Sequence, residues 1–319
     1  MRENVEQEFI ARIKVLHDTV WEGHASRPAV EGWLDNFARL PAPEAPRERL
    51  FALCLLSQFM YFGSRQMRTL LKSLYRDKYK YPIVERIRRM NADTLNTAFI
   101  QARFQETLDG TRFLGIGNPS ESGVHLLYYY RQENQLKKKY FINAHEIISV
   151  EGGRRVLRYP DVTRYVFVDD FCGSGSQGKR YSNDILVELK NLAPGCIAAY
   201  HVLFATTDGL KSLKDETKFD VVDCIYELDT TFKCFGNDSR YFSRPIDGID
   251  KPGVEAMCRK YGSLLDSADP LGFGDCQLLI GFNHNTPNNS LPIFWFDEPG
   301  GPPWAPIFRR YSKYFGWGK

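Results

Sequence analysis

The sequence of 319 residues has little net charge and no long hydrophobic run. Its formal net charge of +3 is too small to indicate nucleic-acid binding from the overall balance alone. The longest apolar stretch, LFALCLLSQFMYFG, is too short to span a membrane and contains Ser57 and Gln58. The first residues, MRENVEQEFI, show neither the apolar core nor the small-residue cleavage site of a secretory signal. We therefore expect neither a membrane-spanning nor a secreted protein.

Cysteines are present, but their spacing suggests no bonded framework. The seven cysteines are scattered, odd in number and never arranged as CxxC. Such spacing is not typical of a disulfide scaffold or of a zinc site. Reduced thiols are the rule in the cytoplasm, so the sequence predicts a cytoplasmic protein.

The first third of the chain is predicted to be helical. Apolar residues recur at steps of three and four over residues 5–20, which places them on one helix face. The stretch APRERLFALCLLSQFMYFG predicts a mostly buried helix that ends at Gly63. The proline-rich LPAPEAP, residues 40–46, is predicted to link two helices. Residues 1–108 are therefore expected to form an α-helical N-terminal region.

The pattern changes after residue 108. Strand-like and helix-like segments alternate, and the strand-like ones are RFLGIG, FINAHEIISV, RYVFVDD, CIAAYHVLFATT, FDVVDCIYEL and CQLLIGFN. Such alternation predicts an α/β domain with one parallel sheet and right-handed crossovers. We expect this domain to cover residues 109–319, with an irregular insertion near residues 230–270.

The stretch RYVFVDDFCGSGSQGKR carries the clearest chemical signal. An apolar strand ends in Asp169 and Asp170, and a loop of small residues leads into a predicted helix. Ligands of open α/β sheets bind beyond the carboxyl ends of the strands. Two carboxylates there can accept hydrogen bonds from ribose hydroxyls, and a glycine loop before a helix suits a phosphate. A plain strand–turn–helix with surface acids is the alternative.

Two enzyme families have nearly this string. It resembles the phosphoribosyl-pyrophosphate motif of type I phosphoribosyltransferases, and it resembles the cofactor motif of DNA amino-methyltransferases, in which DPFCGSGT is common. The second acid, Asp170, favours the first family, because methyltransferases usually have proline there. The methyltransferases also need a (D/N/S)PP(Y/F) segment, and the candidate here is GPPW, residues 301–304, in which glycine has no side-chain acceptor.

The resemblance to phosphoribosyltransferases implies several binding roles. Asp169 and Asp170 would hold the ribose, with Asp170 as the preferred general base, and Mg²⁺ would enter through the pyrophosphate without a direct protein ligand. The 5′-phosphate would lie in the loop formed by Gly173, Ser174, Gly175, Ser176 and Gln177. The pyrophosphate would bind an earlier loop formed by Gly117, Asn118, Pro119, Ser120, Glu121 and Ser122. A helix cap made by Ser120 or Ser122 is compatible with that role.

A mobile flap is also implied between the next two strands. The segment EGGRRVLRYPD has that place, with Gly152 and Gly153 as hinges and Arg154 and Arg155 to meet pyrophosphate. An ordinary surface hairpin is the alternative.

More narrowly, the chain resembles the phosphoribosyltransferase-like proteins of bacterial conflict, or anti-phage, systems, including effectors found beside some retron reverse transcriptases. The segments that carry this resemblance are WLDNF, LLSQFMYFGSRQMRTLL, GNPSESG, VFVDDFCGSGSQ and LLIGFNHNTPNNSLPIFW. It implies an effector that transfers or cleaves at C1′ of a ribose-phosphate nucleotide. Gln177 departs from the Ser or Thr of common phosphoribosyltransferases. A non-catalytic nucleotide sensor and an S-adenosylmethionine-dependent nucleic-acid methyltransferase stay open as alternatives.

Two further segments suggest partners. The loop NHNTPNNSLP, residues 283–292, follows a strand expected in the same sheet, so His284, Asn285, Thr286 and Asn288 could contact an acceptor, unless the loop is only a polar turn. Residues 65–90 hold nine basic residues against two acids, with tyrosines between them. This suits nucleic acid or a reverse-transcriptase or other defence-system partner, although a solvated helix face is the more common cause. The basic residues are Arg65, Arg68, Lys72, Arg76, Lys78, Lys80, Arg86, Arg88 and Arg89.

Overall fold

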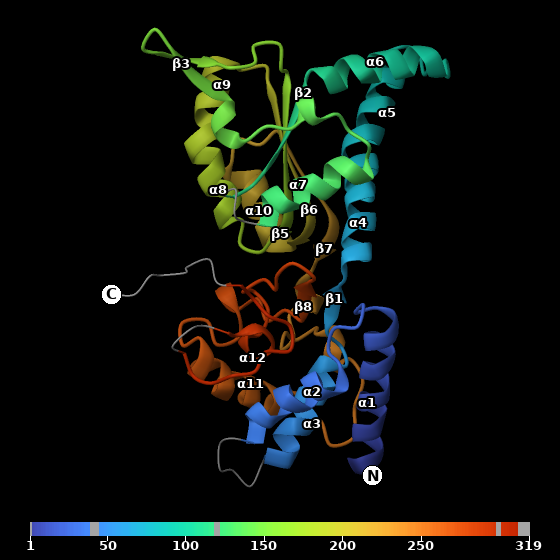
Figure 1. Cartoon of the computed structure of the whole chain (residues 1–319), viewed down its shortest axis with the longest axis vertical. Coiled ribbons are helices and arrows are strands. Elements are labelled where there is room, and N and C mark those ends of the chain that lie inside the picture. Colours follow the sequence, from blue (N-terminus) through green and yellow to red (C-terminus); the bar gives the residue numbers. More distant parts are fainter. Residues whose placement is uncertain (1, 39–44, 118–121, 298–300, 312–319) are drawn as a thin grey trace. The chain divides into compact units, whose positions relative to one another are not determined.

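The structure is a computed structural model that describes residues 2–38, 45–117, 122–297 and 301–311. It divides into two compact units (Figure 1). Unit 1 joins residues 1–67 to residues 229–319, and unit 2 is the continuous stretch 68–228. The predicted border at residue 108 does not coincide with this division, because the last helices of the N-terminal region belong with the sheet and the first ones pack with the C-terminal part.

Unit 2 is built on a four-stranded parallel sheet, which confirms the predicted α/β class. Its strands are β2 (Thr111–Gly115), β5 (Arg164–Cys172), β6 (Ile197–Thr206) and β7 (Val221–Leu228), in the order β2-β5-β6-β7. Each neighbouring pair is parallel, with Val168 of β5 opposite His201 of β6. The carboxyl ends of β2, β5 and β6 therefore lie along one edge of the sheet.

Helices cover both faces of this sheet (Figure 1). One face packs on α8 (Ser176–Tyr181), a π-helical turn (Ser182–Leu186) and α9 (Val187–Leu192), which form one helical run, and on α10 (Thr207–Glu216). On the other face, Phe113 of β2 contacts the π-helical segment Leu74–Lys80 and α7 (Ser122–Glu133) through Tyr75, Tyr79 and Tyr130. The sheet is therefore buried on both sides, as parallel sheets are.

The remaining elements of unit 2 lie before and between these strands. The helical run 64–89 consists of α4 (Ser64–Ser73), the π-helical segment and α5 (Tyr81–Arg89), and α6 (Thr97–Asp109) leads into β2. The border between the units falls within α4, after Met67. An antiparallel hairpin of β3 (Ile148–Glu151) and β4 (Arg154–Leu157) precedes β5.

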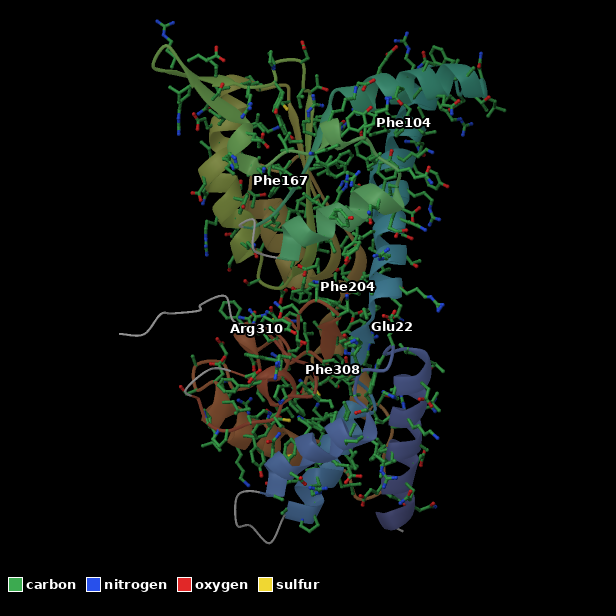
Figure 2. The ribbon with its side chains drawn as sticks, viewed as in Figure 1. Glu22, Phe104, Phe167, Phe204, Phe308 and Arg310 are labelled. Atoms are coloured by element: carbon green, nitrogen blue, oxygen red, sulfur yellow. The ribbon has the colours of Figure 1, made fainter. Side chains whose placement is uncertain are left out.

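Unit 1 combines the two ends of the chain. From the N-terminal part come α1 (Arg2–Thr19), α2 (Arg27–Leu34), α3 (Ala45–Leu56) and β1 (Met60–Phe62). From the C-terminal part come α11 (Lys251–Leu265), β8 (Ile280–Phe282) and α12 (Pro292–Trp295). They share one core rich in aromatic residues, in which Phe308 stacks on Phe59 at 4.5 Å and on Tyr61 at 4.8 Å between ring centroids (Figure 2).

Three sequence predictions for this unit are wrong. The helix predicted to end at Gly63 ends at Leu56, and residues 60–62 form a strand instead. The strand predicted from CQLLIGFN pairs in parallel with β1 in a separate two-stranded sheet, not with the main sheet. The segment 230–270 is not an irregular insertion, because it contains α11, which buries Val254 and Tyr261 in the core.

Glu22, between α1 and α2, fixes the start of α4. Its carboxylate accepts hydrogen bonds from the backbone N–H groups of Ser64 and Arg65, each at 2.9 Å, which caps the helix. Gly63 makes room for this contact, since a Cβ there would lie 2.4 Å from Cδ of Glu22. Figure 2 labels Glu22 beside the start of this helix. Across the part of the chain that the structure describes, no helix is both long and apolar enough to cross a bilayer.

Candidate functional site

The loop after β5 is shaped by glycine. Gly175 stands at the N-cap of α8 with φ +74°, a left-handed conformation that residues with a Cβ rarely adopt. A Cβ at Gly175 would also lie 3.2 Å from the carbonyl oxygen of Gly209 and from Cγ of Leu213. The loop therefore needs glycine both for its turn and for its close approach to α10.

The start of α10 holds the other side of this loop. The Thr206 hydroxyl donates to the carbonyl oxygen of Gly173 at 2.6 Å and accepts from the N–H of Gly209 at 3.0 Å. A Cβ at Gly209 would lie only 2.2 Å from the carbonyl oxygen of Gly173. The backbones of the loop and of α10 thus touch, and this contact fixes the position of the loop.

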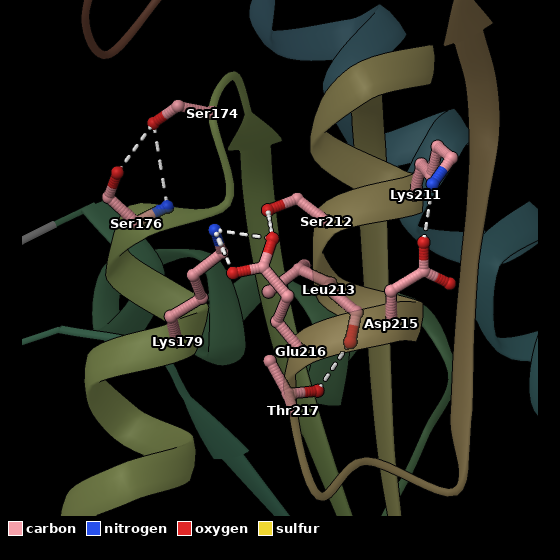
Figure 3. A network of polar contacts seen from close by, with 9 residues as sticks. All are labelled: Ser174, Ser176, Lys179, Lys211, Ser212, Leu213, Asp215, Glu216 and Thr217. Carbon is pink, nitrogen blue, oxygen red and sulfur yellow. Dashed lines mark hydrogen bonds and ion pairs between the residues drawn. The ribbon is translucent and has the colours of Figure 1, made fainter.

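The N-terminus of α8 has no side-chain cap. The N–H of Ser176 donates to Oγ of Ser174 at 3.4 Å, which is longer than an ordinary hydrogen bond, and the two hydroxyls lie 2.7 Å apart. Both serines are exposed. Figure 3 shows how Lys179 of α8 pairs with Glu216 of α10 at 3.0 Å, which ties the two helices together below the loop. The positive end of a helix dipole is in general a favourable place for an anion.

Asp169, at the end of β5, is turned into the protein. Its side chain is 4% exposed, and its Oδ1 accepts from the backbone N–H of Asp170 at 2.9 Å. Its Oδ2 accepts from the hydroxyl of Tyr200 of β6 at 2.7 Å. Both oxygens are therefore engaged by the protein, and a ribose contact by Asp169 stays a prediction.

The two acids form one titrating pair. Burial, and then the charge of Asp170, hold the pKa of Asp169 well above its ordinary value, and the two side chains are hydrogen-bonded to each other. A raised pKa means that Asp169 holds its proton to a higher pH than a free aspartic acid does. Burial, and then the charge of Asp169, also raise the pKa of Cys172 to about 12. The Cys172 thiol therefore carries no thiolate at neutral pH and is no nucleophile.

The loop after β2 is fastened to α8 by one side chain. The Tyr181 hydroxyl donates to the carbonyl oxygen of Gly117 at 2.6 Å and accepts from the N–H of Gly117 at 2.9 Å. Gly117 has φ +108°, where glycine is strongly favoured. The first residue of the predicted pyrophosphate loop therefore lies beside the helix of the predicted phosphate loop. Asn118, Pro119, Ser120 and Glu121 lie outside the described residues, as does the side chain of Ser122.

Comparison with family models gives one match, to the family described as PRTase-CE, over residues 30–310. The chain belongs to the PRTase-CE family. Solved structures similar to this chain include the Helicobacter pylori xanthine-guanine-hypoxanthine phosphoribosyltransferase, which is 11% identical, with 52% of this chain and 85% of that one covered at a TM-score of 0.28. The orotate phosphoribosyltransferase of Aeropyrum pernix is 13% identical, with 40% and 73% covered at a TM-score of 0.24. No curated protein matches.

The PRTase-CE assignment agrees with the predicted phosphoribosyltransferase-like domain, and it rests on the family match, because structural likeness at these scores carries no argument. The sequence singles out the acid pair and both loops, whose binding roles stay predictions, but it does not single out Tyr181, Tyr200, Thr206 and Gly209, which contact them. Only Thr206 had a local signal, because Thr206 and Thr207 stand just before the helix-like DGLKSLKDE and threonine is a common helix cap. The other three act through contacts between elements that lie far apart in the sequence.

The predicted flap of this PRTase-CE protein is a hairpin. Gly152 (φ +56°) and Gly153 (φ +77°) form its two-residue turn, which requires two positive φ angles. Arg154 is exposed, and Arg155 pairs with Glu188 of α9 at 2.7 Å. The hairpin is therefore present at the expected place, and pyrophosphate binding by its arginines stays a prediction.

The loop of residues 283–292 was expected near the site because the strand before it was expected in the main sheet. That strand, β8, lies outside the main sheet, so this reason no longer holds. Thr286 is fully buried and donates to the carbonyl oxygen of Phe308 at 3.1 Å. The Asn285 side chain accepts from the N–H groups of Thr286 and Tyr311, each at 3.1 Å. These side chains stabilise the loop itself. Contact of His284 or Asn288 with an acceptor stays a prediction.

Much of the charge in the basic window is paired within the chain. Arg68 and Lys72 both contact Glu133, Lys78 pairs with Asp223 at 2.9 Å, and further pairs join Arg76 to Asp77 and Arg89 to Glu85. Tyr75 and Tyr79 are buried, so they are not placed to stack on bases, whereas Tyr81 is 54% exposed. Binding of nucleic acid or of a protein partner to this helix therefore stays a prediction.

Within the described part of the chain, no group of three or more His, Cys, Asp or Glu side chains is placed to hold a metal ion. All seven cysteines lie among the described residues, and no disulfide bond joins any two of them.

Proposed function

We propose that this chain binds phosphoribosyl pyrophosphate, or a related ribose-phosphate nucleotide, and transfers or cleaves at its C1′ carbon. The observation that carries the proposal is the uncapped N-terminus of α8, which Thr206 and Gly209 hold in place at the carboxyl edge of the sheet. The Tyr181–Gly117 contact brings the second loop beside it. Two loops that each bind an anion would suit a ligand that carries two phosphate groups.

Each loop would bind a different part of the ligand. Residues 173–177 would bind the 5′-phosphate through backbone N–H groups, and residues 117–122 would bind the pyrophosphate. Mg²⁺ bound through the pyrophosphate would supply positive charge against the charge that develops on the leaving group. The C1′–oxygen bond to pyrophosphate would break, and a bond from C1′ to a nitrogen acceptor, or to water oxygen in cleavage, would form.

Asp170 is our choice for the group that contacts the sugar. As the carboxylate of the pair it can accept a ribose hydroxyl, and it can take the proton that the attacking nucleophile loses. Asp169 would act through Asp170 and Tyr200, because its own oxygens are bonded within the protein. Its protonated state would keep the charge on Asp170.

Isothermal titration with phosphoribosyl pyrophosphate and Mg²⁺ tests the binding step. We expect the wild-type protein to bind. Asp170→Asn should bind at least about tenfold more weakly, because it loses a charged hydrogen-bond partner. Asp208→Asn is the matched control, because Asp208 is an exposed acid in the first turn of α10. Binding of S-adenosylmethionine without binding of phosphoribosyl pyrophosphate would overturn the proposal and support the methyltransferase alternative.

A second candidate is a non-catalytic sensor of the same ligand. The observation in its favour is that Tyr200 and the backbone of Asp170 occupy both oxygens of Asp169, so one acid fewer is offered to the ribose. Release of pyrophosphate separates the two candidates. An enzyme releases it when phosphoribosyl pyrophosphate is mixed with a panel of nucleobases, or with water alone, whereas a sensor binds the ligand and returns it intact.

The resemblance to conflict-system proteins extends the proposal to anti-phage defence, in which the activity would be toxic to the cell that carries it. Induced expression in bacteria tests this. We expect wild-type protein to stop growth and to lower the cellular pool of phosphoribosyl pyrophosphate, and we expect Asp170→Asn at equal protein level to do neither. Equal growth arrest by both proteins would separate toxicity from this site.

A further inference from the structure

Unit 1 contains a cavity of about 270 Å³. It lies between the second half of α1, the segment 57–62 that includes β1, and Gln66. Every lining residue belongs to unit 1, so the cavity does not depend on how the two units are placed. It is therefore separate from the residues of the proposed ribose-phosphate site, which belong to unit 2.

The walls of the cavity are mostly apolar. They include Leu16 of α1, Val20 just after this helix, and Phe59, Met60 and Phe62 of the facing segment. An engineered apolar cavity of about 150 Å³ holds benzene, and drug-sized ligands occupy from roughly 300 Å³ upward. A single substituted ring thus matches the space that these side chains enclose.

One hydrogen-bond donor of the lining is unused. Trp21 is completely buried, and its indole Nε1 has no partner. The other tryptophans that the structure describes all donate: Trp33 to the carbonyl oxygen of Ile293 at 2.7 Å, Trp295 to that of Ser290 at 2.7 Å and Trp304 to that of Ile293 at 3.0 Å. A buried donor without a partner costs about 1–3 kcal/mol, so this exception needs an explanation.

A positive charge lies at the same cavity. Arg12 of α1 lines it and is exposed, and none of the described acidic side chains forms an ion pair with its guanidinium. Two groups of the lining can bind an anion, the Trp21 N–H, which has no partner, and the Arg12 guanidinium, which has no described ion pair. A ligand that satisfies both must bring acceptor atoms and negative charge.

We propose that unit 1 binds a small ring compound that carries a carboxylate. The ring fills the apolar part of the cavity, a carboxylate oxygen accepts from Nε1 of Trp21, and Arg12 balances the negative charge. The indole N–H is fully buried, so the ligand must displace a lining side chain to reach it. Met60 is half-buried, unbranched and flexible, which makes it the side chain that moves most easily.

The indole N–H resonances of the ¹⁵N-labelled full chain test this directly, with benzoate as the probe. Trp21→Phe assigns the Trp21 signal, and the Trp33 signal is the internal control, because its N–H is already bonded. We expect benzoate to move the Trp21 signal in a saturable way and to leave the Trp33 signal in place. A Trp21 signal that stays unchanged up to the solubility limit of benzoate would overturn the proposal.

Two further measurements examine the charge. Arg12→Gln changes an exposed residue, so the fold is retained, and we expect benzoate to bind this variant roughly fivefold more weakly, as loss of one exposed charge pair predicts. Benzyl alcohol, of similar size but neutral, should bind the wild-type protein more weakly than benzoate does. Equal binding of both probes, or of benzoate to both proteins, would contradict a carboxylate site.

Discussion

Two strand-to-helix connections at the edge of the sheet, from β5 to α8 and from β6 to α10, differ in how the helix begins. At the start of α10, Thr206 accepts the N–H of Gly209, so this helix satisfies its own first turn. At the start of α8, Gly175 provides the turn but no side chain caps the helix. The strands before them, β6 and β5, are neighbours in the sheet. One helix start therefore supports the neighbouring loop, whereas the other has no capping side chain at its N-cap residue.

The close contact between the two connections should give the largest effect when it is broken. Gly209→Ala would place a Cβ 2.2 Å from the carbonyl oxygen of Gly173, and a backbone atom cannot move aside as a side chain can. We expect a loss of roughly 3 kcal/mol in the free energy of unfolding, within the range of overpacking, together with loss of phosphoribosyl pyrophosphate binding. Urea unfolding and isothermal titration measure the two effects.

Gly195→Ala is the control for this change, because a Cβ at Gly195 meets nothing within 4 Å. It should leave both quantities near their wild-type values. A Gly209→Ala protein as stable as the control would mean that the two connections are less tightly joined than the structure shows.

The next largest effect is expected from Asp169 at the end of β5, which is hydrogen-bonded to Tyr200 of β6. The folded protein keeps a proton on Asp169 at a pH where the unfolded chain, with an ordinary pKa near 3.9, has lost it. The free energy of unfolding must then fall as pH rises above that value, by up to about 1.4 kcal/mol per pH unit, until the pH reaches the raised pKa. Asp169→Asn stays neutral at every pH, so its free energy of unfolding should not fall with rising pH through this group. It should therefore be more stable than the wild type at pH 7.

Urea unfolding at a series of pH values provides the measurement, with Asp208→Asn as the control for loss of an exposed acid nearby. An Asp169→Asn protein that is less stable than wild type at pH 7 would show that Asp169 is ionised in the folded state. Its hydrogen bond with Tyr200 would then be the stronger bond of a charged acceptor.

Removal of the cap on α10 should have a smaller effect. Thr206→Val keeps the shape of the side chain but leaves the Gly209 N–H and the Gly173 carbonyl oxygen without this partner. We expect a cost of about 1–2 kcal/mol in unfolding and weaker ligand binding, because the loop loses its anchor. Thr207→Val, at an exposed neighbour bonded to Glu227, is the matched control. If both variants behave alike, the cap is not what positions the loop.

The smallest effect is expected from the ion pair that joins α8 to α10 at the surface. Lys179→Gln removes the contact with Glu216, whose side chain is exposed to solvent, as that of Lys179 is in part. Exposed pairs contribute little and are screened by salt, so we expect no change in the urea midpoint at high salt and only a slight decrease at low salt. A large, salt-independent loss would show that Lys179 has a further role in the loop.

The same comparison shows what the sequence can and cannot predict. The strand–acid–loop–helix order around Asp169 is local, so the α/β class and the position of the loop could be predicted from periodicity and residue type. The partners of that loop could not. Tyr181 and Tyr200 look like ordinary core aromatics in the sequence, and only the fold brings their hydroxyls to Gly117 and to Asp169.

The wrong predictions in unit 1 have a related cause. A short apolar segment such as residues 278–282 shows that a strand is present but not which strand it joins, and β8 pairs with β1 from the other end of the chain. The segment 230–270 looked irregular because its turns are rich in Gly, Pro, Asp and Ser, although α11 lies among them with Pro252 in its first turn.

The division of the chain into units has a consequence for the order of events during synthesis. Unit 2 is one continuous stretch, so all of it has been translated before the last ninety or so residues of unit 1 exist. The ribosome adds residues over seconds, whereas small domains fold faster than that, so the sheet can form while the chain is still growing. Meanwhile α3, with its buried Phe51 and Leu55, has no α11 to cover it. A nascent chain stalled once β7 has left the ribosome, but before α11 has, should therefore carry a folded sheet and an exposed apolar helix that attracts chaperones.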